Sequence, residues 1–107
     1  MNYTPEGLKK LLDEAFNQRF IYTDCGFRYH HYLTLDRTIS IRVSGFPSSK
    51  VLDIAVPFIR DGKPMYLTLA NKDKFKAILP HDEPLTKLES IVTTLEGLGL
   101  KITRLNP

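Results

Sequence analysis

The stretch that decides the fold is Ile54–Leu69, which reads IAVPFIRDGKPMYLTL. Asp61-Gly62 lies between two runs of β-favouring residues, and this dipeptide is typical of a two-residue type I′ turn. If Arg60 pairs with Lys63, six apolar residues fall on one face of a hairpin. The pairs are Phe58 with Met65, Val56 with Leu67, and Ile54 with Leu69. The sequence therefore predicts a β-hairpin whose register is set by its turn.

Two prolines agree with this register. In the predicted pairing, Pro57 and Pro64 fall at positions whose backbone N–H would point away from the hairpin partner. Proline has no N–H, so the hairpin itself loses no hydrogen bond, but a further strand beside either proline would lose one. We therefore expect the Asp61-Gly62 end of the hairpin to be an exposed edge.

A second hairpin is predicted upstream, over residues 28–43. Apolar residues alternate with polar ones in both of its strands, and the first strand follows a turn predicted at residues 22–26. A three-residue loop keeps the apolar set on one face, whereas placing Ile39 opposite Thr34 mixes the two faces. The pattern therefore favours three pairs, which are Leu35 with Ile39, Leu33 with Ile41, and His31 with Val43.

Helices are indicated at both ends of the chain by apolar residues at three- and four-residue spacing. Thr4 is a candidate N-cap for the first helix, and Asn71 and Asp82 are candidates for a short helix and a long last helix. The first stripe is Leu8, Leu11, Leu12, Ala15 and Phe16, and the last is Leu85, Leu88, Ile91, Val92, Leu95 and Leu98. Residues 100–105 are short and β-like, and we expect them to return as a strand.

These elements predict one α+β domain over residues 1–107. Its expected architecture is a single antiparallel sheet of four to five strands, made of two hairpins plus a C-terminal strand. The N-terminal helix and the long C-terminal helix are expected to pack on one face of this sheet, because that arrangement buries every apolar stripe.

The composition of the chain limits which cellular compartments and which classes of protein are expected. The chain has 107 residues, 42% of them hydrophobic, and a net charge of +3. Cys25 is its one cysteine, so an intrachain disulfide is excluded. The start of the chain lacks the basic and apolar regions of a secretory signal, and no apolar run approaches the ~20 residues that span a bilayer. We expect a cytoplasmic protein without membrane attachment.

The sequence gives little support to catalysis or to a bound cofactor. Cys25 and His30 are the candidates for a nucleophile pair in a small hydrolase or transferase, but adjacent His30 and His31 point to opposite sides of a strand. His31 falls on the apolar side, where we expect a core histidine. The spacing of cysteine and histidine residues fits no metal site, and glycine-rich nucleotide-binding motifs are absent. We therefore expect no catalytic residues, no metal and no cofactor.

The candidate binding surface is the sheet face opposite the apolar stripes. If both hairpins join one sheet, this face presents tyrosine beside arginine, a combination favoured at protein interfaces and also able to stack and hold nucleic acid. The predicted partner-binding residues are Arg28, His30, Tyr32, Arg42 and Tyr66. The alternative is that this face binds no partner and is a partly solvated surface that keeps the domain soluble.

We expect a small non-catalytic protein that modulates or inhibits a larger protein partner, such as an accessory factor encoded by a phage or plasmid. Nucleic-acid binding through the same face is the alternative, and a homodimer formed through sheet edges or helix faces is a further expectation. The order helix, antiparallel strands, helix is similar to that of the double-stranded-RNA-binding domain. The last helix, however, starts with Asp82-Glu83-Pro84 in place of a basic cluster. The strand–helix–strand order and glycine-aromatic signature of RNA-recognition-motif proteins are also absent, so neither comparison assigns residues.

Overall fold

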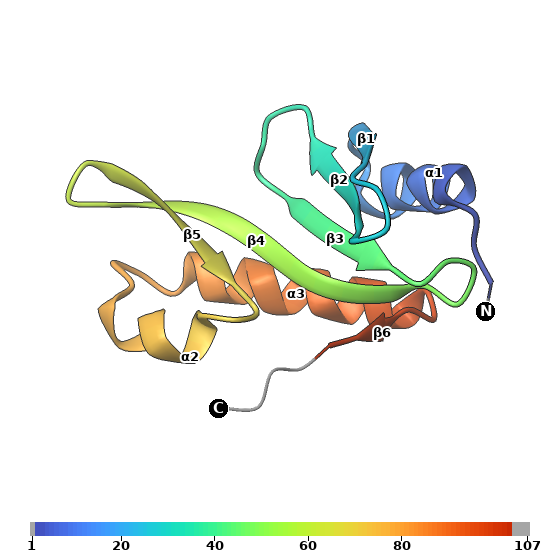
Figure 1. The fold of residues 1–107 in the computed structure, drawn as a ribbon. Helices are drawn as coiled ribbons and strands as arrows, with labels where there is room; N and C mark the ends of the chain where they lie inside the picture. Colours follow the sequence, from blue (N-terminus) through green and yellow to red (C-terminus); the bar gives the residue numbers. More distant parts are fainter. Residues whose placement is uncertain (1, 104–107) are drawn as a thin grey trace.

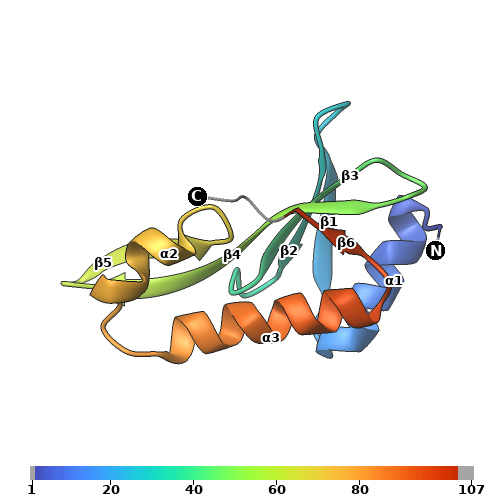
Figure 2. The same cartoon turned by 90° about the horizontal axis from the view of Figure 1, so that it is seen from below.

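A computed structural model describes residues 2–103 of the chain, which form a mostly antiparallel sheet with helices packed on one face (Figures 1 and 2). The strand order is β1-β2-β3-β4-β5, and β6 pairs with β4 in parallel. The elements are α1 (Pro5–Phe16), β1 (Phe20–Asp24), β2 (His30–Thr34), β3 (Ser40–Ser44), β4 (Lys50–Arg60), β5 (Lys63–Thr68), α2 (Lys72–Phe75), the 3₁₀ turn η1 (Lys76–Ile78), α3 (Glu83–Gly97) and β6 (Lys101–Ile102). The predicted α+β fold class is confirmed.

The core lies between the sheet and its two longer helices. Leu8 and Leu12 of α1 and Leu88 and Leu95 of α3 are fully buried in the same cluster as the inward side chains of β1 to β5. Figure 2 shows α3 running along one side of β4 with α1 at its far end. No helix within residues 2–103 is long and apolar enough to cross a bilayer.

The β4–β5 hairpin has the register that its sequence predicts. Arg60 pairs with Lys63, and the alternation continues to Ala55 opposite Thr68. Asp61 and Gly62 form the two-residue turn with φ angles of 52° and 75°, the positive values that a type I′ turn requires. Residues 61–64 are all exposed, as expected for this end of the hairpin.

The register predicted for the β2–β3 hairpin is wrong. Tyr32 pairs with Ile41, and the Thr34 N–H donates to the Ile39 carbonyl, so every residue of β2 lies on the opposite face from the one expected. The hydroxyl of buried Thr34 explains this outcome. It accepts from the N–H groups of Thr38 (3.0 Å) and Ile39 (3.1 Å), and it donates to the Asp36 carboxylate (2.8 Å). These bonds stabilise a longer loop in which a polar residue takes a core position.

Two further predictions differ from the structure in detail. The segment predicted as a turn at residues 22–26 contains most of β1, which pairs antiparallel with β2 and adds a strand to the sheet. The predicted C-terminal strand is present as β6, and its expected continuation beyond Thr103 lies outside the described residues. β1 is short and only Phe20 in it is fully buried, so it lacks the strong alternation by which strands are found in sequence.

Candidate functional site

The side of the sheet opposite the helices carries a surface that we call the uncovered face. Its members follow from the register, because side chains directly opposite each other on paired strands share a face. One row crosses four strands and the next row crosses five, with two more rows on the β4–β5 hairpin. The rows are Thr23, His31, Arg42 and Asp53; Ile21, Leu33, Ser40, Ala55 and Thr68; Pro57 and Tyr66; and Ile59 and Pro64.

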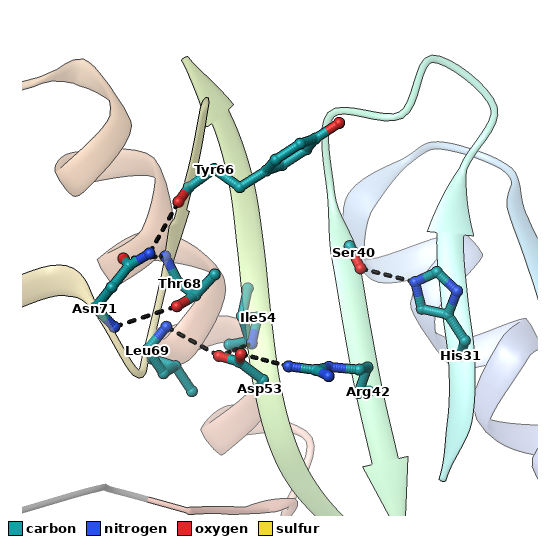
Figure 3. A network of polar contacts seen from close by, with 9 residues as sticks. All are labelled: His31, Ser40, Arg42, Asp53, Ile54, Tyr66, Thr68, Leu69 and Asn71. Carbon is teal, nitrogen blue, oxygen red and sulfur yellow. Dashed lines mark hydrogen bonds and ion pairs between the residues drawn. The ribbon is translucent and has the colours of Figure 1, made fainter. Parts of the chain in front are cut away.

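An ion pair joins β3 and β4 at the centre of this face. Nη2 of Arg42 lies 2.6 Å from Oδ2 of Asp53 (Figure 3). The other carboxylate oxygen, Oδ1, accepts from the backbone N–H groups of Ile54 (2.9 Å) and Leu69 (3.0 Å). The Asp53 side chain is 10% exposed and that of Arg42 is 44% exposed. Asp53 therefore holds the guanidinium in place while leaving much of it open to solvent.

The sheet reaches this arrangement through a β-bulge. Arg42 pairs with Asp53 and Val43 pairs with Val51, so Leu52 is the extra residue on β4. Bulges re-aim side chains locally. Here the bulge returns Val51 to the core while Asp53 stays on the uncovered face, within reach of Arg42.

A histidine and a serine form a second polar contact beside this pair. Nε2 of His31 on β2 lies 2.7 Å from Oγ of Ser40 on β3 (Figure 3). Burial lowers the pKa of His31, and the positive charge of Arg42 lowers it further. The ring of Tyr29 lies edge-on to His31, and the Arg42 guanidinium stands 5.6 Å from the Tyr29 ring centre. At neutral pH this cluster has a neutral imidazole and one cation that is already partnered.

Apolar side chains flank the polar centre on both sides. Six large apolar residues of the described chain are exposed, and four belong to the uncovered face or directly continue its alternation. These four are Ile21 (49% exposed), Leu35 (61%), Ile59 (60%) and Tyr66 (56%). Such a concentration on one side of a small domain is typical of an interaction surface.

Two of the five predicted binding residues lie on the uncovered face. Arg42 stands at its centre, and Tyr66 projects from β5 towards β3 (Figure 3). Arg28 is exposed in the turn before β2. Ser40 is expected on this face from the alternation of β3, whereas its contact with His31 depends on the true register. The sequence missed Asp53, whose pairing with Arg42 depends on the bulge.

Tyr32 and His30 do not lie where the sequence placed them. Tyr32 is fully buried, and its hydroxyl donates to the Pro5 carbonyl oxygen of α1 at 2.7 Å. His30 points to the same side and stacks on the ring of Tyr22, with Phe46 edge-on. The shifted register accounts for both corrections. It also moves His31, predicted as a core histidine, onto the uncovered face, where it is half-buried.

The candidate nucleophile pair is not brought together. Nδ1 of His30 lies 2.6 Å from the Tyr22 hydroxyl, and Sγ of Cys25 lies 3.8 Å from the Thr23 carbonyl oxygen. Each group therefore has a different partner. Within residues 2–103, no three histidine, cysteine, aspartate or glutamate side chains are grouped so as to hold a metal ion.

A hollow on the helical side of the molecule contains none of the predicted residues. It has a volume of about 590 Å³ and lies between the end of α1 and one side of α3. Its floor includes Phe16, Ile39 and Ile91, and Thr86, Ser90 and Thr94 belong to its α3 wall.

Comparisons of the chain with protein-family models, with curated proteins and with solved structures found no match.

Proposed function

We propose that this chain is a non-catalytic module that binds another protein through the uncovered face and thereby modulates or inhibits it. The observation that carries the proposal is the concentration of exposed apolar side chains on that face. Leaving Ile21, Leu35, Ile59 and Tyr66 in water is unfavourable, and a partner that covers them recovers roughly 25 cal/mol for each Å² of apolar surface.

The charge distribution favours a protein over nucleic acid as the partner. Arg42 is the cation at the centre of the face, and Asp53 already balances its charge. Lys72, Lys74 and Lys76 lie on α2 and η1, beside β5 rather than on the face (Figure 1). A phosphate backbone requires several unpaired cations along one track. The uncovered face presents a mixed polar and apolar surface instead, as protein interfaces do.

The chemistry of the face also describes the partner surface that would fit it. Apolar side chains of the partner would cover the two apolar ends, near Ile21 and near Tyr66. Between them, a neutral hydrogen-bond acceptor would meet the exposed part of Arg42, which uses Nη2 for Asp53 and has further N–H donors. Such a partner buries no unpaired charge, because Arg42 stays neutralised by Asp53.

Site-specific photo-crosslinking tests the proposal. A benzophenone amino acid replaces Tyr66 in one variant and Glu89, exposed on α3, in a matched control variant. Both are irradiated in a nuclease-treated native lysate. We expect a discrete protein adduct from position 66 and none from position 89. An adduct that adding Arg42→Glu greatly diminishes would support the face as the contact. Equal adducts from both positions, or none from position 66, would overturn the proposal.

A further inference from the structure

The strands at the two ends of the strand order, β1 and β5, differ in how many of their outward-facing backbone groups have hydrogen-bond partners. On β5, the register turns the backbone groups of Pro64, Tyr66 and Thr68 away from β4. Pro64 has no N–H. The Asn71 side chain donates through Nδ2 to the Tyr66 carbonyl oxygen (3.0 Å) and accepts from the Thr68 N–H (2.8 Å), as Figure 3 shows. Asn71 and Pro64 thus remove two of the three outward N–H donors of this edge and leave that of Tyr66.

β1 has no comparable closure. The Cys25 N–H donates to the Tyr29 carbonyl oxygen, and the Leu35 N–H donates to that of Arg19. These bonds show that odd-numbered residues of β1 turn their backbone groups to β2, so even-numbered ones turn outward. The outward N–H of Phe20 is taken by Oδ1 of Asp13 (2.8 Å).

The next two outward positions are open. Within residues 2–103 the backbone groups of Tyr22 and Asp24 have no hydrogen-bond partner outside the sheet. Figure 2 shows α1 and β1 diverging from their short connection, and Asp13 of α1 contacts the edge of β1 at Phe20, the first residue of the strand. Thr23 and Asp24 at the other end of β1 are exposed, and Phe27 at the hairpin tip is fully exposed.

We propose that the outer edge of β1, at Tyr22 and Asp24, binds an extended segment of a partner polypeptide as an added strand. An extended chain presents N–H and C=O groups at the two-residue spacing of the two open positions, so it can pair with both. Its alternate side chains would lie beside Ile21 and Thr23, which favours apolar residues there. This inference shares with the proposed function only the premise that the partner is a protein. The added strand would bind backbone groups of β1, whereas the proposed function uses the side chains of the uncovered face.

A bare extended segment fits this edge better than a second copy of the chain. The β5 edge of a copy offers a single open N–H donor, that of Tyr66, because Asn71 and Pro64 remove the donors on either side of it. To pair through more than one donor, the copy would have to offer β1, which carries α1 beside it (Figure 2). Antiparallel pairing of two β1 strands keeps equivalent faces on the same side, so it brings two α1 helices together under the new junction. An extended segment brings no helix.

The test uses random linear peptides displayed on phage and selected on the wild-type chain. Asp24→Pro removes the outward N–H at an edge position without touching the bonds to β2, as Pro57 and Pro64 do in the other hairpin. Asp24→Ala is the matched control, since it loses the same side-chain bond to the Gly26 N–H but keeps the backbone donor. We expect the selected peptides to bind Asp24→Pro about tenfold more weakly or worse, and Asp24→Ala as they bind wild type.

Hydrogen exchange on the wild-type chain gives a second readout that needs no variant. Bound peptide should slow exchange at the Tyr22 and Asp24 amides and leave the Tyr66 amide unchanged. Selected peptides that bind Asp24→Pro normally, or that protect neither β1 amide, would overturn the inference. So would a wild-type chain of twice the monomer mass that Asp24→Pro returns to a monomer, because the occupant would then be a second copy. Crosslinking at Tyr66 can fail while this test succeeds, and the reverse, so the two proposals are separable.

Discussion

The β4–β5 hairpin turns through Asp61 and Gly62, whereas the β2–β3 hairpin turns through the longer segment from Leu35 to Thr38. In the first, both turn residues have positive φ, and the backbone of the turn alone fixes which residues pair. In the second, Arg37 has positive φ, but the loop is held by the hydroxyl of Thr34, which is buried under the sheet. A two-residue turn fixes the register of its hairpin through its own backbone conformation. With a longer loop, the register depends on which side chains pack and hydrogen-bond favourably in the core.

The largest effect should come from removing the hydroxyl that organises the longer loop. Thr34→Val keeps the shape of the side chain but leaves the buried N–H of Ile39 without its side-chain acceptor. We expect the free energy of unfolding, measured by urea denaturation, to fall by about 2–3 kcal/mol. Thr23→Val, at an exposed position on β1, is the control and should change it by less than about 0.5 kcal/mol. A similar small change for both would mean that the hydroxyl of Thr34 does not hold the register.

A smaller effect is expected at the two-residue turn. Gly62 has a φ of 75°, and a Cβ added there would meet no atom within 4 Å, so Gly62→Ala tests backbone strain alone. We expect a loss of about 1 kcal/mol in the free energy of unfolding. Gly97→Ala near the end of α3 also meets no atom, but its backbone is helical, so the same substitution should stabilise. Losses of equal size at both glycines would contradict this explanation.

The smallest effect should be a pH dependence at His31. Burial and Arg42 hold the pKa of its imidazole below the unfolded value of about 6.5. The neutral ring is therefore favoured in the folded state. Its contribution to stability is complete above that value and is lost as the pH falls through the folded pKa. His31→Gln should flatten the decline of stability below about pH 6.5.

Nuclear magnetic resonance titration of the imidazole separates the two causes. Arg42→Gln removes the positive charge, so the pKa of His31 should rise while burial still holds it below the ordinary value. A pKa of His31 in this variant that is unchanged would show that Arg42 does not act on the ring.

The candidate site was partly accessible to sequence reasoning. Arg42 and Tyr66 were placed on the outer face correctly, because Tyr66 belongs to the hairpin with the local turn and Arg42 alternates with buried Ile41 and Val43. Tyr32 was assigned to the wrong side, because its placement relied on a predicted three-residue loop between β2 and β3, and the actual loop is longer. The Asp53 ion pair could not be predicted, since it depends on a bulge that shifts the register of β3 against β4.

The amino-acid sequence by itself determined the helices and the β4–β5 hairpin. A cap, an apolar stripe and a two-residue turn each act over a few neighbouring residues, so their patterns can be recognised without the rest of the fold. Only the tertiary structure decided which side of β2 enters the core, that β1 pairs with it, and which sheet edge stays open. These features depend on contacts between residues far apart in the chain, such as Tyr32 with Pro5 and Arg42 with Asp53. A local sequence pattern contains no information on which of these long-range contacts is more stable.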